Sequence, residues 1–378
     1  MTAPAGSSLS PLEIACGLAI DGRPARRPTP LPPSPATPQR ALRDAVLPAL
    51  LRPPCLVSFS GGKDSSLVLA TATRVAREEG LADPVPVTNR FPQAPEADET
   101  TWQEQVVGYL GLRDWQRVEL TDELDVVGPY AQRMLSDHGL LWPFNVHFHL
   151  PLLDHARGGS LLTGVGGDQL FDALRAPPRR PRPRAVAHAA LAVAPRTARA
   201  AVIARRRPFD APWLLAAARR AATRAMARQL AAQPRGPLAA RMAYELSLRY
   251  LRVATDSLAL CAAARDVRVG HPLCAPGVWS AIARACGRRS RFAGSQQVLR
   301  GLFGGWLPDA LAARSDKASF DGVFSNRHAR DFARRWDRGG IPHWLVDAAA
   351  LRGGWLAATP PVLSLTLMQA AWLYAQRN

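Results

Sequence analysis

One stretch constrains this chain more than any other: residues 55 to 66 read Cys-Leu-Val-Ser-Phe-Ser-Gly-Gly-Lys-Asp-Ser-Ser. The apolar run Leu56 to Phe59 is typical of a buried parallel strand, and the helix-forming run Leu67 to Glu79 follows the two glycines. A strand that turns through glycine into a helix N-terminus presents unpaired backbone N–H groups and the positive end of the helix dipole. This loop therefore predicts a phosphate site.

The polar side chains of the loop suit a phosphate that carries a metal ion. Ser60, Ser65 and Ser66 supply hydroxyl donors. Asp64 is an acid where phosphate is expected, which makes sense if it holds a divalent cation against that phosphate. The loop has neither the Gly-Lys-Ser/Thr ending of a Walker A loop nor the Gly-x-Gly-x-x-Gly of a dinucleotide site, so both classes are excluded.

Two further segments carry related signals. The stretch Ser160 to Phe171 reads Ser-Leu-Leu-Thr-Gly-Val-Gly-Gly-Asp-Gln-Leu-Phe, a short apolar strand that runs into glycines and an acid. In the C-terminal third, Val298-Leu-Arg-Gly-Leu-Phe and Leu307-Pro-Asp precede Arg314-Ser-Asp-Lys-Ala-Ser-Phe. Because both glycine-acid segments follow predicted strands, we expect them to meet at the carboxyl edge of one sheet and to form one nucleotide site.

The first segment resembles the pyrophosphate-binding loop, Ser-Gly-Gly-x-Asp-Ser, of ATP pyrophosphatases, which cut ATP between its α and β phosphates. The three segments in this order, over roughly residues 50 to 325, resemble the synthetase domain of the asparagine-synthetase-like family, whose relatives include β-lactam synthetases and lasso-peptide cyclases. The resemblance implies that a substrate carboxylate attacks the α-phosphate of Mg-ATP, giving an acyl adenylate and pyrophosphate. Ammonia or an amine then displaces AMP to form an amide.

The resemblance also implies roles for single residues. Mg²⁺ would be held by Asp64 and Asp168, although Asp168 also suits the N-cap of a helix. Lys317 would be the catalytic cation: of 48 basic residues only Lys63 and Lys317 are lysines, and lysine is a compact cation whose pKa can shift. Lys63 stands at the variable position of its loop and is interpreted as a solvent-facing or phosphate-neighbouring charge. The implied ATP contacts are Ser58, Phe59, Ser60, Gly61, Gly62, Asp64, Ser65, Ser66, Val87, Thr88, Thr163 and Gly164.

Predicted strands alternate with predicted helices from residue 42 onward, which indicates an α/β fold with a doubly wound parallel sheet, of the adenine nucleotide alpha-hydrolase-like type that the resemblance implies. The expected elements are helix 42–51, strand 56–59, helix 67–79, strand 84–89, helix 100–110, strand 117–120 and strand 161–163. We expect a proline-rich N-terminal arm (1–41), an ATP-binding α/β domain (42–180) and a mostly helical part (181–378) that carries the Arg-x-x-Lys-x-x-Phe segment. The last part should contain one long helix at 239–264 and a final amphipathic helix at 363–374.

The chain departs from the family pattern in three places. Glutamine-dependent asparagine synthetases begin with a catalytic cysteine on a glutaminase domain, whereas residue 2 here is Thr2, so we expect no ammonia-generating half. Val165 stands where the family usually has an acid or a tyrosine, and Gln169 replaces the usual glutamate. Cys274 or Ala275 stands where an aspartate is usual. We therefore expect an intact nucleotide half and an acceptor half that is not built for asparagine.

Composition limits the compartment and the partners. Five cysteines without a C-x-x-C pair suggest reduced thiols and a cytoplasmic protein, and no apolar stretch predicts a membrane span. The net charge is +18, from 48 Lys and Arg against 30 Asp and Glu. Arginines on solvated helix faces are the better explanation of this charge, and a basic surface for an acidic or phosphorylated partner is the alternative. The arginine-rich stretch 179–207 has no interleaved aromatics, so we expect no nucleic-acid partner.

Two weaker candidates have ordinary structural explanations as well. His147 and His149 would share one face if they lay on a strand, but no Cys or Glu stands at zinc-ligand spacing, so packing near aromatic residues is the better interpretation. Tyr244 and Glu245 could supply a base, although a plain helix surface is the better interpretation.

The sequence predicts an asparagine synthase-like, ATP-dependent carbon–nitrogen ligase. Its donor would be a small-molecule or peptide carboxylate, and its acceptor an amine or ammonia from a separate source or partner protein; peptide natural-product biosynthesis fits such a reaction. The alternative is a catalytically reduced ATP-binding partner protein of a peptide-modifying complex, in which Val165 and Ala275 reflect lost chemistry. Sulfur transfer to tRNA is discouraged because paired catalytic cysteines are missing.

Overall fold

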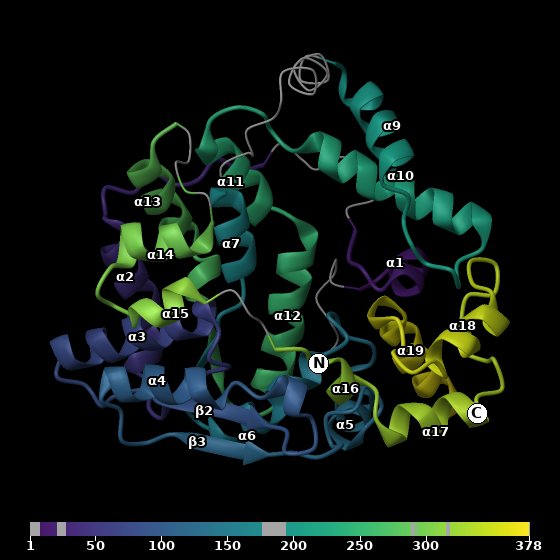
Figure 1. Cartoon of the computed structure of the whole chain (residues 1–378), viewed down its shortest axis with the longest axis horizontal. Helices are drawn as coiled ribbons and strands as arrows, with labels where there is room; N and C mark the ends of the chain where they lie inside the picture. The colour runs from purple at the N-terminus through teal and green to yellow at the C-terminus, as the bar shows by residue number, and fades with distance from the viewer. Residues whose placement is uncertain are drawn as a thin grey trace.

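Five parallel strands form one sheet, and its edge strand β3 (Gln116–Glu119) lies with the neighbouring strand β2 (Val85–Arg90) at the lower edge of Figure 1. The structure is a computed structural model of the 378-residue chain and describes residues 8–20, 28–175, 194–288, 292, 294–314 and 318–377. The strand order is β3-β2-β1-β4-β5, so the chain moves outward from β1 in both directions, which confirms the predicted doubly wound α/β fold. The strands are β1 (Cys55–Ser58), β2 (Val85–Arg90), β3 (Gln116–Glu119), β4 (Ser160–Leu162) and β5 (Arg268–Gly270).

Successive residues of β1 face two different hydrophobic cores. Leu56 packs in the same core as Leu161, its register partner on β4, whereas Val57 packs in the other core with its own partner Leu162. Side chains alternate between the two faces of a strand, so a sheet that is covered on both faces needs apolar residues at successive positions. The sequence Leu-Val in β1 and Leu-Leu in β4 meets this need.

Helices cover both faces of the sheet. They are α2 (Pro38–Leu50), α3 (Lys63–Glu78), α4 (Thr100–Leu110), α5 (Pro129–His138), α6 (Leu150–His155), α7 (Gly167–Leu174), α11 (Leu238–Leu246), α12 (Arg249–Ala263), α13 (Pro276–Cys286), α14 (Ser295–Phe303) and α15 (Asp309–Ala313). On the face that carries Val57, α2 packs against α3 and α13. On the face that carries Leu56, α6 lies against β2 and α12 against β5.

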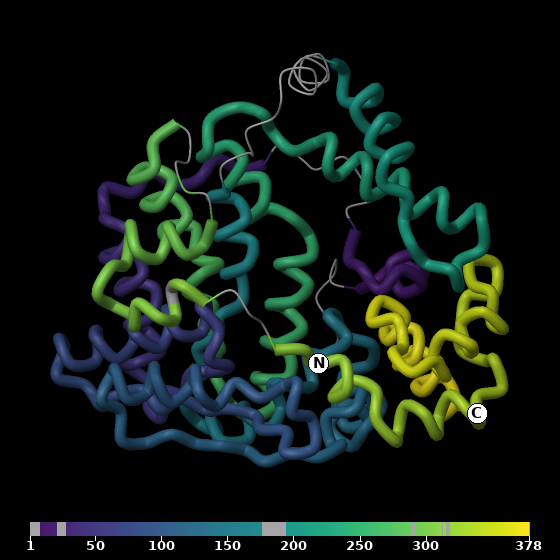
Figure 2. Tube along the Cα trace, viewed as in Figure 1, coloured from purple at the N-terminus to yellow at the C-terminus, as the bar shows by residue number. Residues whose placement is uncertain are grey.

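A second group of helices lies beside the sheet-containing part, at the right of Figure 1. The short N-terminal helix α1 (Pro11–Cys16) packs against the C-terminal helix α19 (Leu365–Ala375), so the first and last helices of the described chain lie side by side (Figure 2). Glu13 of α1 forms a 2.5 Å ion pair with Arg249 of α12, which ties this group to the sheet's helices. The remaining helices are α1 (Pro11–Cys16), α9 (Arg196–Arg206), α10 (Ala216–Ala232), α16 (Asp321–Phe324), α17 (Arg327–Arg335), α18 (Ala348–Trp355) and α19 (Leu365–Ala375), with 3₁₀ segments η1 (Pro95–Ala97), η2 (Val146–His149), η3 (Pro272–Cys274) and η4 (Val362–Ser364).

Some elements differ from the prediction. The single helix expected at 239–264 is two helices, because the backbone is extended at Leu248 (φ −64°, ψ 135°) and the Ser247 hydroxyl donates to the carbonyl of Tyr244 at the end of α11. The last helix is not amphipathic, since even its Gln369 is fully buried. β5 was not expected, because three residues are too few to show a period.

The division of the chain at residues 41 and 180 stays a prediction, since residues 176–193 lie outside the described part. β5 lies beyond the second boundary and still pairs with β4, so the later part of the chain completes the sheet. Within the described residues, no helix is both long and apolar enough to cross a membrane.

Candidate active site

Glycine shapes the loop between β1 and α3. Gly61 has a φ of 81°, in the left-handed region that glycine adopts without strain. A β-carbon on Gly61 would also lie 2.9 Å from Cγ of Gln103 on α4. Gly62 is the N-cap of α3, and among the described residues no side chain caps this helix end by a hydrogen bond. The first backbone N–H groups of α3 therefore border the loop, as an anion site requires.

Two serines tie the loop together. The hydroxyl oxygens of Ser60 and Ser65 lie 3.1 Å apart, Ser65 Oγ donates to the carbonyl of Gly62 at 3.1 Å, and the N–H of Gly62 donates to Ser60 Oγ at 3.3 Å. Ser60 is exposed, whereas Ser66 is fully buried and its hydroxyl has no hydrogen-bond partner among the described residues. Ser60 is therefore placed to meet a ligand, and Ser66 lies beneath the loop.

The second glycine-acid segment lies directly against the first. A β-carbon on Gly167 would come within 2.3 Å of Cγ of Asp64, and one on Gly164 within 3.0 Å of the backbone nitrogen of Ser65. Such approach is possible only without side chains at these two positions. The two segments follow the neighbouring strands β1 and β4, so the loops meet as expected from the sequence.

The positions of Asp64 and Asp168 fit a magnesium ion shared with phosphate. The Asp64 carboxyl lies over the backbone of Gly167, and Asp168 is the next residue, exposed in the first turn of α7. The N-cap of α7 is Gly166, so the N-cap interpretation of Asp168 is wrong. Mg²⁺ usually takes one or two carboxylates and completes its shell with water and substrate phosphate, which agrees with this donor set. In the described ranges no cluster of three or more His, Cys, Asp or Glu could hold a metal by itself.

The third segment reaches the same loop through a buried ion pair. Arg314 donates two hydrogen bonds to the carboxylate of Glu99, at 2.7 and 2.5 Å, and its Nη1 lies 3.4 Å from the carbonyl of Gly61. The backbone N–H of Ala318 donates to the same carboxylate at 3.0 Å. The guanidinium carbon also lies 5.0 Å above the ring of Trp102, at the start of α4. Glu99 therefore anchors the third segment beside the loop.

Of the two lysines, the structure describes Lys63 but not Lys317. Lys317 lies outside the described residues, between Arg314 and Ala318, and its catalytic role stays a prediction. Lys63 is partly buried, with Nζ 3.5 Å from the hydroxyl of Ser295. Burial lowers the pKa of Lys63; the Asp64 charge acts against this, and the Arg314 charge adds to it. Lys63 is therefore a cation at the loop rather than a freely solvated one.

Several of the predicted adenine-side residues are buried and hydrogen-bonded to one another. Phe59 donates its N–H to the carbonyl of Val87 at 2.9 Å, and the Thr88 hydroxyl donates to the carbonyl of Phe59 at 2.7 Å. Thr88 in turn accepts from the indole N–H of Trp115 at 3.0 Å, and the Trp115 ring meets Phe59 edge-on. Phe59, Val87 and Thr88 are buried, whereas Ser58 and Gly164 are partly exposed. Trp115 was missed by the sequence analysis because it belongs to none of the three segments.

The chain matches the asparagine synthase family model over residues 39–359, which is most of its 378 residues. The chain belongs to the asparagine synthase family. The family's domains bind ATP, and its members are ATP-dependent amide-forming ligases. A search of the curated proteins finds no match.

In this member of the asparagine synthase family the ends of β4 and β5 carry an unusual set of groups. Thr163 Oγ1 lies 2.7 Å from Nδ1 of His271 and accepts the N–H of Val165 at 3.3 Å. The Cys274 thiol donates to the carbonyl of Val165 at 3.3 Å. A β-carbon on Gly166 would lie 2.4 Å from Cys274 Sγ, so the thiol fills the space beside the second loop.

The protonation states of this side follow from burial. Burial, with a smaller contribution from His149, lowers the pKa of His271 to about 4, so its ring is neutral near pH 7. Burial raises the pKa of Cys274 to about 12 and keeps it a thiol. In the hydrogen bond between Thr163 Oγ1 and Nδ1 of His271, the tautomer of the ring decides which of the two atoms donates. His271 was missed by the sequence analysis, where only the neighbouring Cys274 and Ala275 drew attention.

The weaker candidates occupy structural positions. His147 and His149 lie on the 3₁₀ segment η2 rather than on a strand, and His147 contacts the carbonyls of Leu124 (2.9 Å) and Phe144 (3.1 Å) with its two ring nitrogens. Tyr244 is buried and donates its hydroxyl to the carbonyl of Gln229, so a plain helix surface does not describe it.

Proposed function

We propose that this protein is an AMP-forming ligase that activates a substrate carboxylate as an acyl adenylate and transfers the acyl group to an amine or ammonia. The observation that carries the proposal is the contact between Gly167 and Asp64, which joins the two glycine-acid loops at the carboxyl ends of β1 and β4. In a doubly wound sheet, ligands bind at this edge, and β1 and β4 flank the point where the strand order reverses.

The residues of the loop have separate tasks in this proposal. Ser60, Gly61 and Gly62 together with the first turn of α3 hold the β and γ phosphates as they leave as pyrophosphate. Asp64 and Asp168 bind Mg²⁺, which supplies charge neutralisation at the phosphates. Lys317 meets the charge that builds up when the carboxylate oxygen attacks the α-phosphorus and the bond to the β-phosphate oxygen breaks.

The acceptor half supports an amine other than the one that makes asparagine. A carboxylate next to the second loop would orient and deprotonate an incoming amine, whereas the groups there are Val165, a protonated Cys274 and a neutral His271. We propose that the acceptor is an amine, or ammonia delivered by a separate protein, and that the donor is a small-molecule or peptide carboxylate. Peptide natural-product biosynthesis in the cytoplasm is the setting that this combination favours.

The groups on the acceptor side also favour one alternative function. If Val165 and Cys274 close the acceptor site, the chain binds ATP as a ligand and serves as a partner protein of a peptide-modifying complex. Such a protein would bind Mg-ATP without cutting it.

Pyrophosphate release distinguishes the two candidates. Wild-type protein would be incubated with Mg-ATP and a panel of acids that includes aspartate and short peptides. A ligase releases pyrophosphate with one class of acid, and Lys317→Ala abolishes that release whereas Arg334→Ala on the surface does not. ATP binding with no release from any acid would overturn the ligase proposal and support the partner protein.

A further inference from the structure

The helices α9 and α10 carry a concentration of positive charge. They pack against each other and lie at the upper right of Figure 1, beyond the helices that cover the sheet. Between residues 194 and 235 the only acidic residue is Asp210. The same span has nine exposed arginines: Arg196, Arg205, Arg206, Arg207, Arg219, Arg220, Arg224, Arg228 and Arg235.

Acidic residues balance some of the arginines elsewhere in the molecule. Arg77 pairs with Asp83 at 2.9 Å, and Arg133 pairs with Asp154 at 3.2 Å. Within the part of the chain that the structure describes, no arginine of α9 or α10 forms an ion pair. Burial, and then repulsion from Arg235 and Arg196, lowers the pKa of Arg199. The positive charge of this hairpin is therefore uncompensated.

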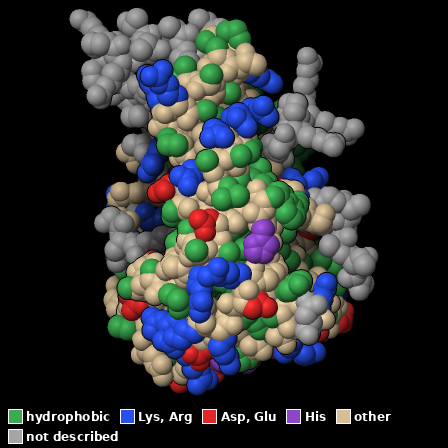
Figure 3. Space-filling view, turned by 90° about the vertical axis from the view of Figure 1, so that its right-hand side faces the viewer, with side chains coloured by type: hydrophobic (Ala, Val, Ile, Leu, Met, Phe, Trp, Pro, Cys, Tyr) green, Lys and Arg blue, Asp and Glu red, His purple; other side chains and the backbone are tan. Residues whose placement is uncertain are grey.

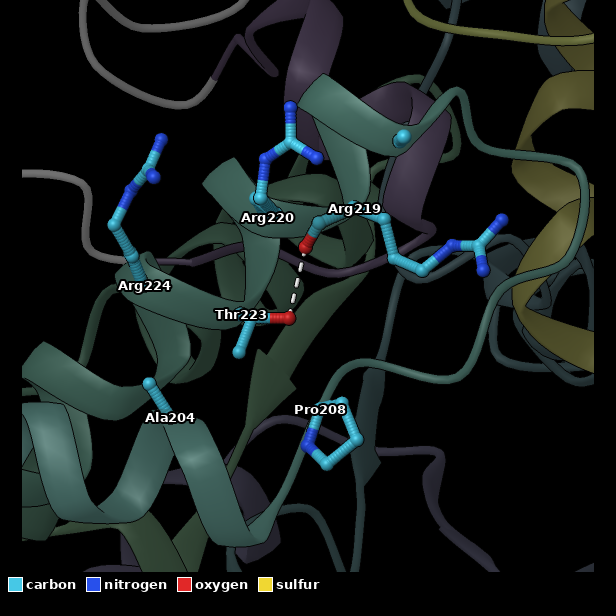
Figure 4. Close-up of a pocket in the computed structure, with 7 residues that line it drawn as sticks. Ala204, Pro208, Arg219, Arg220, Thr223 and Arg224 are labelled. Carbon is cyan, nitrogen blue, oxygen red and sulfur yellow. Dashed lines mark hydrogen bonds between the residues drawn. The ribbon is translucent and has the colours of Figure 1, made fainter.

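The spacing on α10 concentrates the charge further. Arg220, Arg224 and Arg228 stand four residues apart and so share one face of the helix, where like charges repel. Arg220 and Arg224 project from the same side of α10 in Figure 4, while Thr223 turns back and donates to the carbonyl of Arg219 at 2.8 Å. An anion bound along this face would relieve the repulsion.

An apolar hollow lies beside these arginines. It has a volume of about 450 Å³, and its apolar lining comes from Ala204, Pro208 and Ala216, with Arg219, Arg220 and Arg224 at the same hollow (Figure 4). Figure 3 shows the same side of the molecule, where basic and hydrophobic side chains alternate over the upper part. The surface therefore combines cations with a place for an apolar group.

This combination selects among anionic partners. Single-stranded nucleic acids bind to basic surfaces through exposed aromatic rings on which bases stack. The aromatic residues of this hairpin are buried: Phe209 is 6% exposed, and Trp213 is 2% exposed and donates its indole N–H to the carbonyl of Ala15. A hollow lined by alanine and proline suits an aliphatic side chain instead. We propose that α9–α10 is a docking surface for an acidic polypeptide segment, whose carboxylates meet Arg220 and Arg224 and whose apolar side chain enters the hollow.

A labelled peptide of glutamate and leucine, about 16 residues long, tests this surface in the full-length protein. We expect saturable binding that weakens with salt and that falls at least about tenfold in the double variant Arg220→Glu/Arg224→Glu. Arg220→Gln/Arg224→Gln, which only removes charge, should give a smaller loss in the same direction. The matched control Arg334→Glu/Arg335→Glu reverses two arginines on α17 and should bind as the wild type does.

Two further probes fix the chemistry of the partner. A peptide of glutamate and serine with the same charge should bind more weakly, because it offers nothing to the hollow. An oligonucleotide of similar charge should also bind more weakly. Equal binding by wild type and both α10 variants, an equal loss in the α17 control, or tighter binding of the oligonucleotide than of the glutamate–leucine peptide would overturn the proposal.

Discussion

Arg314 and Glu99 form a bidentate ion pair in the interior, and their side chains are only 5% and 6% exposed. Glu99 begins α4, which flanks the first glycine loop, whereas Arg314 belongs to the third segment, more than half the chain away. The pair also brings Arg314 to the carbonyl of Gly61. One ion pair therefore sets the distance between the phosphate loop and the segment that contains Lys317.

We predict that Arg314→Ala destabilises the protein by about 3 to 5 kcal/mol, because it leaves the Glu99 carboxylate buried without its cation. Urea unfolding followed by circular dichroism measures this change. The control Arg334→Ala removes an exposed partner of Asp331 and should cost at most about 1 kcal/mol. Similar small losses for both variants would show that the Glu99 carboxylate does not depend on Arg314.

We predict that Gly167→Ala lowers turnover at least about 10²-fold, because its β-carbon would displace the Asp64 carboxyl from a position 2.3 Å away. Mg-ATP binding by calorimetry and pyrophosphate release both report this loss. Gly108→Ala is the matched control: it lies exposed in α4, where a β-carbon meets nothing within 4 Å, and should stabilise the helix by about 0.5 to 1 kcal/mol. Unchanged ATP binding in Gly167→Ala would mean that the two loops do not act together.

The meeting of the two glycine-acid loops could be predicted from the sequence, since Leu56 to Phe59 and Leu161 to Thr163 are apolar enough to mark parallel strands and the loops follow their ends. The residues that support those loops could not be predicted from the sequence. Glu99 begins a helix as many acids do, and only the tertiary fold brings it to Arg314. His271 was missed for a related reason, because it follows the short strand β5, whose three residues show no period.

We predict that Asp64→Asn and Asp168→Asn each raise the Mg²⁺ concentration needed for half-maximal ATP binding by about tenfold, because an amide is a weaker ligand than a carboxylate for a hard cation. Calorimetric titration of ATP at several Mg²⁺ concentrations gives this value without knowledge of the substrate. Asp172→Asn, exposed on the same helix as Asp168, should leave it unchanged. If Asp172→Asn had the same effect, the response would come from general surface charge instead of a metal site.

We predict that the protein becomes less stable as the pH is lowered from about 6.5 to about 4, and that part of this loss comes from His147. Burial lowers the pKa of His147 to about 4 against the hydrogen bonds to two carbonyls, which favour its charged form. Above pH 6.5 the ring is neutral in both the folded and the unfolded chain. Between pH 6.5 and pH 4 the ring binds a proton in the unfolded chain but not in the folded chain. The free energy of unfolding therefore falls by up to about 1.4 kcal/mol for each pH unit and levels off below pH 4.

Unfolding experiments over this pH range should show a shallower slope in His147→Gln than in the wild type. His343→Gln, on the surface, should keep the wild-type slope. An identical slope in His147→Gln would show that the buried ring does not carry this pH dependence.

Oxygen transfer from a labelled carboxylate tests acyl adenylation most directly. Each acid that supports turnover would be supplied with ¹⁸O in its carboxyl group, together with Mg-ATP and an amine, and the nucleotide products would be analysed by mass spectrometry. Attack of the carboxylate on the α-phosphorus predicts AMP that carries one ¹⁸O atom, unlabelled pyrophosphate, and loss of both products in Asp64→Asn. ADP with ¹⁸O in inorganic phosphate would contradict adenylation, because the carboxylate would then have attacked the γ-phosphorus.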